Sequence, residues 1–444
     1  MSTRPLWAKE GLELDEGIVR YCAGDDWLLD RELLACDLEG TKAHVKGLVA
    51  ISALARDEGE RLLAGLDALL EEHARGEFAP TPDDEDGHSA IERALCERLG
   101  EVGKRVHLGR SRNDQVLTAM RLWMKERLAN AARLCLESAR TALARAEETS
   151  AVVLPGYTHL QRAVPSTAGF WFAAQAESLV DDAEALLGAR RLLDASPLGT
   201  AAGYGVNLAL DRDLVAQELG FPRLVVNGMC AQNGRGRLEA HALSALLCAM
   251  GTVRRLAWDL SLFAMAELGF VKLPERYTTG SSIMPNKRNP DVVEIMRAAF
   301  ADVAGAHAEV LQVLSLPSGY QRDLQRTKGA VLRGVKAASD TLALLPALLR
   351  EVGFDEARAA LALDEGMFAT DRAVELSVSG LPFRDAYRQV AKELQERSGS
   401  RAPEELLEAA RQSVTARVSP GAPGALLLER IAARADEVEG LLSS

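Results

Sequence analysis

Aromatic residues, cysteine motifs and long uncharged stretches are all scarce in this sequence. Aromatic residues make up only 5% of the 444 residues, which disfavours the composition typical of sheet proteins. The six cysteines show no CxxC or metal-finger spacing, and most lie in apolar stretches, so we interpret them as buried free thiols in a reducing compartment. No uncharged stretch is long enough to cross a bilayer, and no apolar segment follows the basic residues near the N-terminus. We therefore expect a cytoplasmic protein that contacts no membrane.

An excess of positive charge is also missing. The formal net charge is −12 and the isoelectric point is near 5.3, whereas a nucleic-acid-binding protein usually needs a basic face. Alanine, leucine, glutamate and arginine dominate instead, and these residues favour helices. A hydrophobic content of 48% allows a large core. The composition predicts an all-α protein without a nucleic-acid partner.

Long helical patterns occupy the middle of the chain. Between Ser111 and Leu154 there is neither glycine nor proline, and apolar residues recur at helical spacing. A helix of about 40 residues spans roughly 60 Å, so it needs partners of similar length. Comparable patterns cover residues 166–196, 238–270 and 291–316. We predict a bundle of long helices, whose additional apolar faces indicate a homo-oligomer.

Glycine and proline positions suggest where the domains end. Shorter helical patterns at residues 51–73 and 90–99 precede the long helices, and Pro403, Pro420 and Pro423 interrupt the region after them. We predict three domains, an N-terminal helical domain at 1–107, a central long-helix bundle at 108–350 and a small C-terminal helical domain at 351–444.

One acidic loop, residues 80–87, lies inside the predicted N-terminal domain. We interpret it as solvated. The histidines that follow, His88 and His107, stand alone in the sequence, so we recognise no set of metal ligands.

Three polar loops interrupt the helical patterns, and loops on a rigid scaffold often carry functional sites. The first, His107-Leu-Gly-Arg-Ser-Arg-Asn-Asp-Gln115, directly precedes the longest helix. Ser111 or Asn113 can cap that helix, whose free N–H groups favour a nearby carboxylate. A capped helix with solvated arginines is the alternative interpretation of this loop.

The second loop is Gly156-Tyr-Thr-His-Leu-Gln-Arg162. Its imidazole, His159, is suited to proton transfer at neutral pH. A lone histidine is more often structural, and that alternative stays open at this point.

The third loop is Gly280-Ser-Ser-Ile-Met-Pro-Asn-Lys-Arg-Asn-Pro-Asp291. It combines backbone N–H groups and hydroxyls with the positive charge of Lys287. We expect Asn289 to cap the next helix and Pro290 to be its first residue. Composition alone is equally compatible with a mobile surface loop.

The order of residues in the third loop resembles the signature Gly-Ser-Ser-x-Met-Pro-x-Lys-x-Asn-Pro of the fumarase/aspartase superfamily, whose members release fumarate by β-elimination. The segments Gly109–Gln115 and Gly156–Ala163 resemble the corresponding regions of argininosuccinate lyases and are poorer matches to the other branches. The similarity runs from about Asp30 to Lys328.

This resemblance implies three helical domains, a homotetramer and active sites that are each assembled from three subunits. It implies that His159 and Ser281 are the catalytic acid and base, that Lys287 holds a substrate carboxylate, and that Glu294 orients the histidine. The substrate-binding residues that it implies are Ser111, Arg112, Asn113, Thr158, Asn289, Tyr320, Gln325 and Lys328. It implies no metal or organic cofactor.

Several segments depart from the family pattern. Asp25 or Asp26 stands where the family has a substrate-binding serine, and Gln232-Asn-Gly-Arg-Gly-Arg237 stands where many members have Ser-Asp-Arg-Asp-Phe. Leu108 replaces a threonine, and Thr200-Ala-Ala-Gly203 replaces Gly-Ser-Gly-Ala. The departures bear on how the guanidinium end of the substrate is held, whereas the elimination residues are intact.

The function implied is the reversible conversion of argininosuccinate to arginine and fumarate by general acid/base catalysis. We hypothesise that Ser281, as an alkoxide stabilised by Lys287 and N–H groups, removes the proton while protonated His159 donates one to the leaving nitrogen. The reverse assignment is open. The alternatives are another fumarate-releasing lyase, such as adenylosuccinate lyase, and a catalytically silent structural relative.

Overall fold

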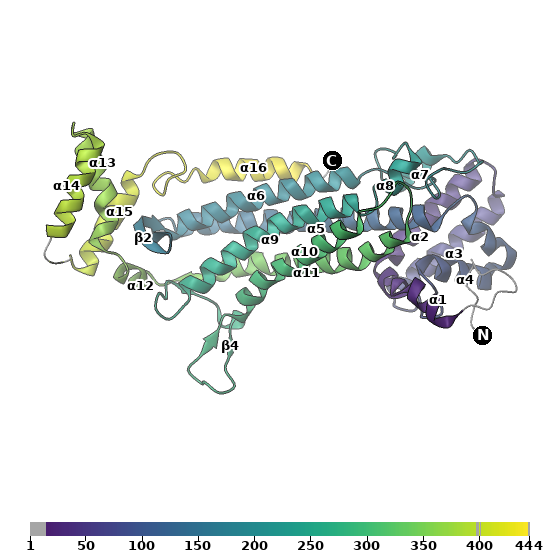
Figure 1. Cartoon of the computed structure of the whole chain (residues 1–444), viewed down its shortest axis with the longest axis horizontal. Coiled ribbons are helices and arrows are strands. Elements are labelled where there is room, and N and C mark those ends of the chain that lie inside the picture. The colour runs from purple at the N-terminus through teal and green to yellow at the C-terminus, as the bar shows by residue number, and fades with distance from the viewer. Residues whose placement is uncertain (1–14, 397–398, 400, 443–444) are drawn as a thin grey trace. The chain divides into compact units, whose positions relative to one another are not determined.

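A computed structural model describes residues 15–396, 399 and 401–442, so the expectation about the N-terminal residues lies outside the described residues. The chain folds mainly into α-helices (Figure 1), which confirms the predicted fold class. It divides into two compact units, each made of three stretches of sequence. The first unit comprises Met1–Ala129, Gly188–Ala245 and Asp302–Lys336, and the second comprises Asn130–Leu187, Leu246–Ala301 and Ala337–Ser444. The predicted boundaries of three domains stay a prediction.

In the described chain, five long helices contribute residues to both units. They are α5 (Arg112–Glu148), α6 (Ala168–Leu193), α9 (Arg237–Phe263), α10 (Asp291–Val313) and α11 (Thr327–Glu351). The sequence pattern predicted the stretches of the first four, in part or in full, but not that of the last one. The predicted helix at 111–154 was too long by six residues at its end, because Val153 already begins a strand.

The first unit also contains shorter helices that build its core. They are α1 (Glu16–Ala23), α2 (Asp26–Ala50), α3 (Arg56–Ala74), α4 (Gly87–Leu99), α7 (Arg212–Glu218), α8 (Gly228–Asn233) and the 3₁₀ turns η1 (Gly100–His107) and η3 (Arg322–Arg326). Leu34, Leu62 and Leu95, from three different helices, are fully buried in one cluster. Each such side chain contributes about 1.5–3 kcal/mol by burial, so α2, α3 and α4 are held together mainly by apolar packing.

The second unit contains three two-stranded sheets and the C-terminal helices. The strands are β1 (Val153–Thr158), β2 (Gln161–Thr167), β3 (Val271–Lys272), β4 (Thr279–Gly280), β5 (Arg288–Asn289) and β6 (Gly353–Phe354), paired antiparallel as β1–β2, β3–β6 and β4–β5. The remaining helices are α12 (Glu356–Leu361), α13 (Ala369–Val378), α14 (Phe383–Glu396), α15 (Pro403–Ala416), α16 (Leu428–Gly440) and the 3₁₀ turns η2 (Glu275–Tyr277) and η4 (Glu365–Phe368).

The prediction of buried cysteines is largely wrong. Among the described residues only Cys135 is fully buried, Cys230 and Cys248 are exposed, and the other three are half-buried. All six thiols are free. Among the described residues, no helix combines the length and the apolar character that a membrane span requires.

Candidate active site

The loop that carries His159 is the turn of a β-hairpin rather than an irregular loop. Thr158 pairs with Gln161, so His159 and Leu160 form a two-residue turn, and both have positive φ values of 54° and 57°. Such a turn favours glycine or asparagine, and positive φ costs other residues on the order of 1–3 kcal/mol. Two bulkier side chains are kept at a strained tip, which is a frequent feature of functional sites.

Contacts on both strands fix this hairpin. On β1, the ring of Tyr157 stacks on Phe270 with centroids 6.4 Å apart. On β2, Arg162 pairs with Asp364 at 2.8 Å. The imidazole of His159 is exposed, and no residue in the described part of the chain forms a hydrogen bond with it. The hairpin is therefore a rigid support that presents a free imidazole.

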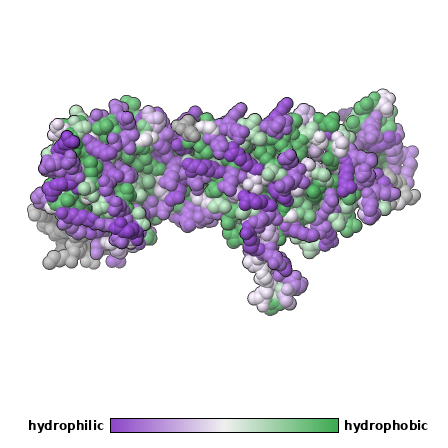
Figure 2. Space-filling model, turned by 180° about the vertical axis from the view of Figure 1, so that it is seen from behind, coloured by the Kyte–Doolittle hydropathy of each residue, from purple (hydrophilic) through white to green (hydrophobic). Residues whose placement is uncertain are grey.

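The signature loop forms a second hairpin, in which β4 pairs with β5 and residues 281–287 connect them. It projects from the ends of α9 and α10 in the second unit (Figure 1), and Figure 2 shows hydrophilic side chains along the projection and less polar ones at its tip. Ile283 and Met284 at the tip are 83% and 44% exposed. These apolar side chains lack a cover within the described chain.

Ser281 lies at the start of this projection and accepts two hydrogen bonds. Its Oγ is 3.0 Å from the backbone nitrogen of Met284 and 3.3 Å from that of Ile283. Two N–H donors that point at one hydroxyl oxygen stabilise negative charge on that oxygen. Both N–H groups thus point at the oxygen that the sequence analysis proposed as the base.

The predicted cap of α10 is wrong. Asn289 lies in β5, opposite Thr279, and the carbonyl of Pro290 accepts the first helical hydrogen bond, from the N–H of Glu294 at 3.1 Å. Pro290 therefore occupies the N-cap position, and α10 begins at Asp291.

The second unit does not bring its predicted catalytic residues into mutual contact. Glu294 pairs with Arg297 at 3.3 Å, and among the described residues no hydrogen bond joins it to His159. Lys287 is exposed, and its ammonium forms no ion pair or hydrogen bond with any described residue, although its backbone N–H donates to the carbonyl of Met284 at 3.1 Å. A single chain therefore presents these groups separately.

The first polar loop is held by a buried carboxylate that the sequence analysis did not single out. Asp114 accepts hydrogen bonds from the backbone N–H groups of Ser111, Gly199 and Ala201 at 3.0, 2.9 and 2.9 Å. Ser111 in turn accepts from the N–H of Asn113 at 3.3 Å. Ser111, rather than Asn113, thus caps α5.

Arg112 is held by the acidic loop, so the interpretation of that loop as solvated was wrong. The guanidinium pairs with Glu85 at 2.9 Å and Asp86 at 3.3 Å, and it donates to Ser89 Oγ at 2.7 Å. Asp86 is only 7% exposed and accepts from the backbone N–H of Ser89, which caps α4. The acidic loop therefore binds the guanidinium group of Arg112 through ion pairs and a hydrogen bond.

Lys328 is the most deeply buried cation of the predicted set, with 1% of its surface exposed. Its ammonium pairs with Asp30 at 2.6 Å and with Asp26 at 3.1 Å. Burial lowers the pKa of Lys328, but the two carboxylates outweigh burial and raise it above its usual value. Of the two aspartates named in the departure from the family pattern, Asp26 is half-buried and pairs with Lys328, whereas Asp25 is exposed.

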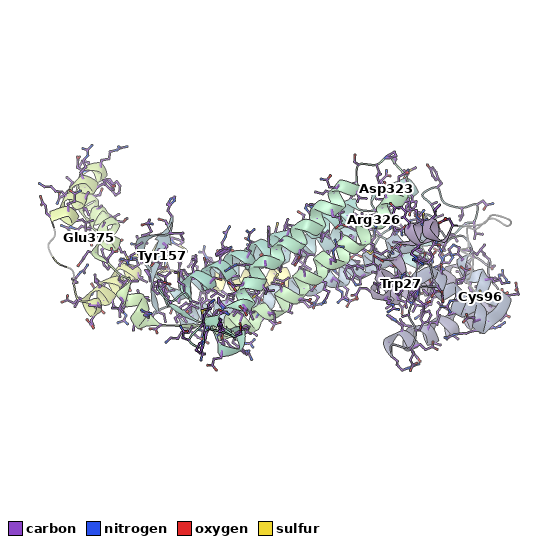
Figure 3. The ribbon with its side chains drawn as sticks, turned by 60° about the horizontal axis from the view of Figure 1, so that its bottom comes forward. Trp27, Cys96, Tyr157, Asp323, Arg326 and Glu375 are labelled. Carbon is purple, nitrogen blue, oxygen red and sulfur yellow. The ribbon has the colours of Figure 1, made fainter. Side chains whose placement is uncertain are left out.

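The 3₁₀ turn η3 explains why Gln325 points inward. Asp323 and Arg326 lie side by side on this turn and are both exposed (Figure 3), whereas Leu324 is buried. The half-buried Gln325 donates to the carbonyls of Cys22 and Ala23 at 3.2 and 2.9 Å. In the first unit, Gln325 thereby joins η3 to the end of α1.

His88 does not stand alone, in contrast to the prediction. It forms a buried ion pair with Asp37 of α2, and both residues are at least nine-tenths buried. Burial lowers the pKa of His88, but the carboxylates of Asp37, Asp86 and Asp30 raise it above the ordinary value.

This pair predicts a pH-dependent stability. A folded-state pKa that lies above the unfolded value gives a stabilisation that is complete below the unfolded pKa, about 6.5, and is lost as the pH rises through the folded-state pKa. Asp37→Asn leaves the buried imidazole unpaired, so we expect a loss of about 3–5 kcal/mol near pH 6 and a smaller loss above pH 8. Thermal unfolding measured across this range tests the trend. The exposed Asp57→Asn is the control, and a pH-independent loss in Asp37→Asn would contradict the pairing.

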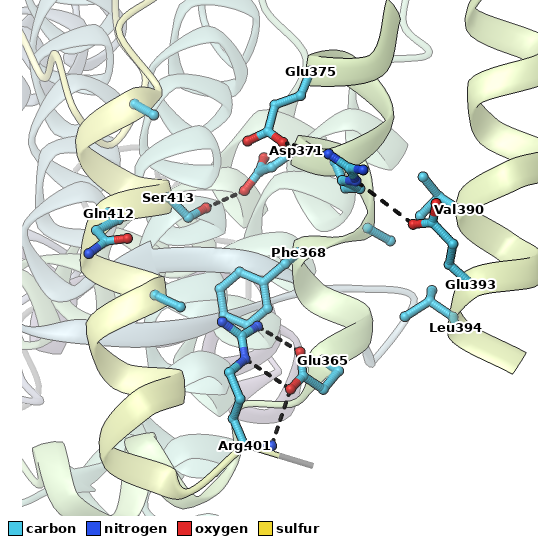
Figure 4. A pocket seen from close by; sticks show the side chains of 14 residues that line it. Glu365, Phe368, Asp371, Glu375, Val390, Glu393, Leu394, Arg401, Gln412 and Ser413 are labelled. Atoms are coloured by element: carbon cyan, nitrogen blue, oxygen red, sulfur yellow. Dashed lines mark hydrogen bonds and ion pairs between the residues drawn. The ribbon is translucent and has the colours of Figure 1, made fainter. Parts of the chain in front are cut away.

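A separate cavity of about 480 Å³ lies among η4, α13, α14 and α15 in the second unit (Figure 4). Its charged side chains have partners, since Glu365 pairs with Arg401 at 2.6 Å and Asp371 accepts a hydrogen bond from Ser413 at 2.5 Å. None of the predicted site residues lines it. The cavity is therefore not where we expect the elimination chemistry.

Comparisons with known proteins identify the family of the chain. Residues 23–305 match a family described as lyase. The chain is 50% identical to the argininosuccinate lyase of Xylella fastidiosa (strain 9a5c), covering 97% of this chain and 95% of the relative. The chain belongs to the argininosuccinate lyase family. It is also 51% identical to the argininosuccinate lyase of Sorangium cellulosum (strain So ce56), over 98% of this chain and 99% of that relative.

Solved structures show that the fold is shared more widely than the family. The EDDS lyase in complex with formate aligns with a TM-score of 0.77 at 22% identity, covering 97% of this chain and 91% of that one. A class II fumarase from Schistosoma mansoni aligns with a TM-score of 0.71 at 17% identity, over 86% of this chain and 91% of that one. These likenesses show a shared fold, and membership of the argininosuccinate lyase family rests on the sequence identity.

Proposed function

We propose that the protein catalyses the reversible β-elimination of argininosuccinate to arginine and fumarate, the last step of arginine biosynthesis. The observation that carries this proposal is the identity of about half of all residues to argininosuccinate lyases over nearly the whole chain. The hydrogen bonding around Ser281 supports the same chemistry. We also place the protein in the cytoplasm.

Ser281 is the proposed base. Elimination requires removal of a weakly acidic C–H proton next to a carboxylate, and the N–H groups of Ile283 and Met284 stabilise the serine alkoxide that removes it. Lys287 and Asn289 hold the neighbouring carboxylate, so that the negative charge of the carbanion spreads into it. Stabilisation of this developing charge is the largest contribution to the rate that we expect.

His159 is the proposed acid. The imidazolium donates a proton to the guanidino nitrogen as the C–N bond breaks, and fumarate and arginine result. Thr158 lies beside it in the same hairpin, and Glu294 of another subunit is proposed to orient the ring. Because a single chain presents these groups separately and exposed, we propose a homotetramer in which three subunits complete each site.

The amino-acid end of the substrate is assigned to residues of the first unit. Ser111, Arg112 and Asn113 stand at the start of α5 and Tyr320, Gln325 and Lys328 stand near the start of α11. Arg112 and Lys328 are both held by carboxylates, which fixes their positions before substrate arrives and so lowers the entropic cost of binding.

The projecting signature loop predicts closure over the bound substrate. Its exposed Ile283 and Met284 gain a cover when the loop closes, which also excludes water from the reaction. We expect argininosuccinate, supplied to an inactive Ser281→Ala variant, to slow tryptic cleavage after Lys287 or Arg288 by about tenfold or more. Cleavage after the exposed Arg75 is the internal control. Equal slowing at both positions, or at neither, would contradict closure.

A comparison of two substrates tests the proposed function against its nearest rival, adenylosuccinate lyase. We expect purified protein to release fumarate from argininosuccinate and to leave adenylosuccinate unchanged, as measured by ultraviolet absorbance. Release from adenylosuccinate alone would replace the proposal with that rival, and release from neither would favour a silent structural relative.

A further inference from the structure

Arg235 is a buried cation whose side chain has no hydrogen-bonding partner in the described chain. It lies in the turn Gly234-Arg235-Gly236 between α8 and α9 and is 5% exposed. Among the described residues, no carboxylate or carbonyl forms an ion pair or hydrogen bond with its guanidinium. Buried arginines are almost always paired, because an isolated charge is costly to desolvate. An unpaired one therefore needs an explanation.

The guanidinium is stacked on an aromatic ring rather than enclosed. It lies over Tyr320, with 5.6 Å between its central carbon and the ring centroid. Its nitrogens are not among the fully enclosed, unpaired side-chain atoms, so each keeps a small accessible surface. A planar guanidinium fixed in this way is prepared for a bidentate contact with a carboxylate.

The glycine that follows fixes this arrangement. Gly236 has φ of +79°, and a Cβ atom there would lie 2.2 Å from Leu314 Cδ2. A side chain at position 236 is thus excluded both by the backbone conformation and by packing. The tight turn separates the buried Arg235 from Arg237, which is exposed.

The charges around Arg235 show which class of ligand it can take. Burial raises the pKa of Asp26, and the charges of Lys328 and Arg235 oppose that rise. Arg235 also opposes the rise that burial causes in the pKa of Glu239, so it lies within electrostatic range of both carboxylates. Glu239 accepts hydrogen bonds from backbone N–H groups and not from Arg235. The carboxylates of Asp26 and Asp30 are already committed to Lys328. A second guanidinium would be repelled by Arg235, whereas a carboxylate would complete its hydrogen bonding.

We propose that Arg235 binds the α-carboxylate of the arginine portion of the substrate while stacked on Tyr320. This inference rests on the proposed function and adds a specificity-determining residue to it. Argininosuccinate carries three carboxylates, and the proposed mechanism assigns one of the two succinate carboxylates to Lys287 and Asn289. It assigns the amino-acid end, which carries the α-carboxylate, to residues that include Tyr320. Because Arg235 lies over Tyr320, the α-carboxylate is the one that we assign to it. Arg235 would then reject amines that carry a guanidino group but no carboxylate.

Two substrates and two variants test this assignment. The substrates are argininosuccinate and its analogue in which hydrogen replaces the α-carboxylate of the arginine portion. In the wild type, we expect kcat/KM for the analogue to be about 100-fold lower. In Arg235→Gln, we expect kcat/KM for argininosuccinate to fall about 100-fold, mainly through KM, while kcat/KM for the analogue changes less than about threefold. Arg237→Gln is the matched control and should preserve the wild-type discrimination.

Each outcome decides one question. Loss of discrimination in Arg235→Gln alone supports the assignment. Equal losses for both substrates, or retained discrimination, would overturn it. Arg235→Lys keeps the charge in place and should restore part of the discrimination, which tests the assignment even if Arg235→Gln fails to fold. A wild type that releases fumarate from neither substrate would refute the proposed function itself.

Discussion

Replacing Ser281 with alanine is expected to lower kcat for fumarate release about 1,000-fold or more. The variant loses the oxygen on which the N–H groups of Met284 and Ile283 converge, and no described side chain replaces it. Steady-state measurement of fumarate by ultraviolet absorbance gives the rate. Because Ser281 lies in a projecting hairpin outside the packed core, we expect the melting temperature to change by less than about 2 °C.

Ser282 provides the matched control for this prediction. It is the next residue, it is exposed, and no hydrogen bond of its side chain is found in the described chain. Ser282→Ala should therefore retain the wild-type kcat within about threefold. Equal losses in the two variants would indicate damage to the loop as a whole, and an active Ser281→Ala would remove the proposed base.

Replacing His159 with asparagine is expected to lower kcat about 100- to 10,000-fold without loss of stability. Asparagine tolerates positive φ better than histidine does. The variant should therefore keep the backbone conformation at position 159, where φ is 54°, with less strain, while it removes the proton donor. The loss should appear in kcat rather than in KM, because His159→Asn removes the proton donor and leaves Thr158 and the other substrate-binding residues in place. Thermal unfolding together with steady-state kinetics measures both quantities.

Leu160→Asn is the control for His159→Asn. Leu160 has the same backbone conformation, with φ of 57°, and its side chain is 75% exposed. This variant relieves the same turn but leaves the imidazole in place, so activity should stay within about threefold of the wild type. A His159→Asn variant that eliminates at the wild-type rate would exclude the histidine from the reaction.

The long helices could be predicted because their signal is local. A stretch without glycine or proline that repeats apolar residues at helical spacing has few alternatives, and the start of α5 after Ser111 follows from this pattern. The error at its far end is instructive, because β1 depends on distant partners. Val153 packs against Leu363 and Met367, which lie more than 200 residues further along the chain. A local sequence pattern cannot predict such a contact.

Candidate site residues could be proposed from the sequence where a motif is contiguous, whereas contacts between distant segments were missed. Ser281 and Lys287 belong to one continuous signature. The pair of His88 and Asp37 joins residues 51 positions apart, and the acidic loop was misread because its guanidinium partner, Arg112, lies well beyond it. The sequence shows which residues are charged but not which distant residues they pair with. Only the structure shows which of these pairs are buried.

The most direct test of the account is to supply purified protein with argininosuccinate and to quantify fumarate and arginine together. The account predicts that the two products appear in a one-to-one ratio, and that both disappear in the Ser281→Ala variant but not in Ser282→Ala. Absence of both products from the wild type, or fumarate without arginine, would contradict it.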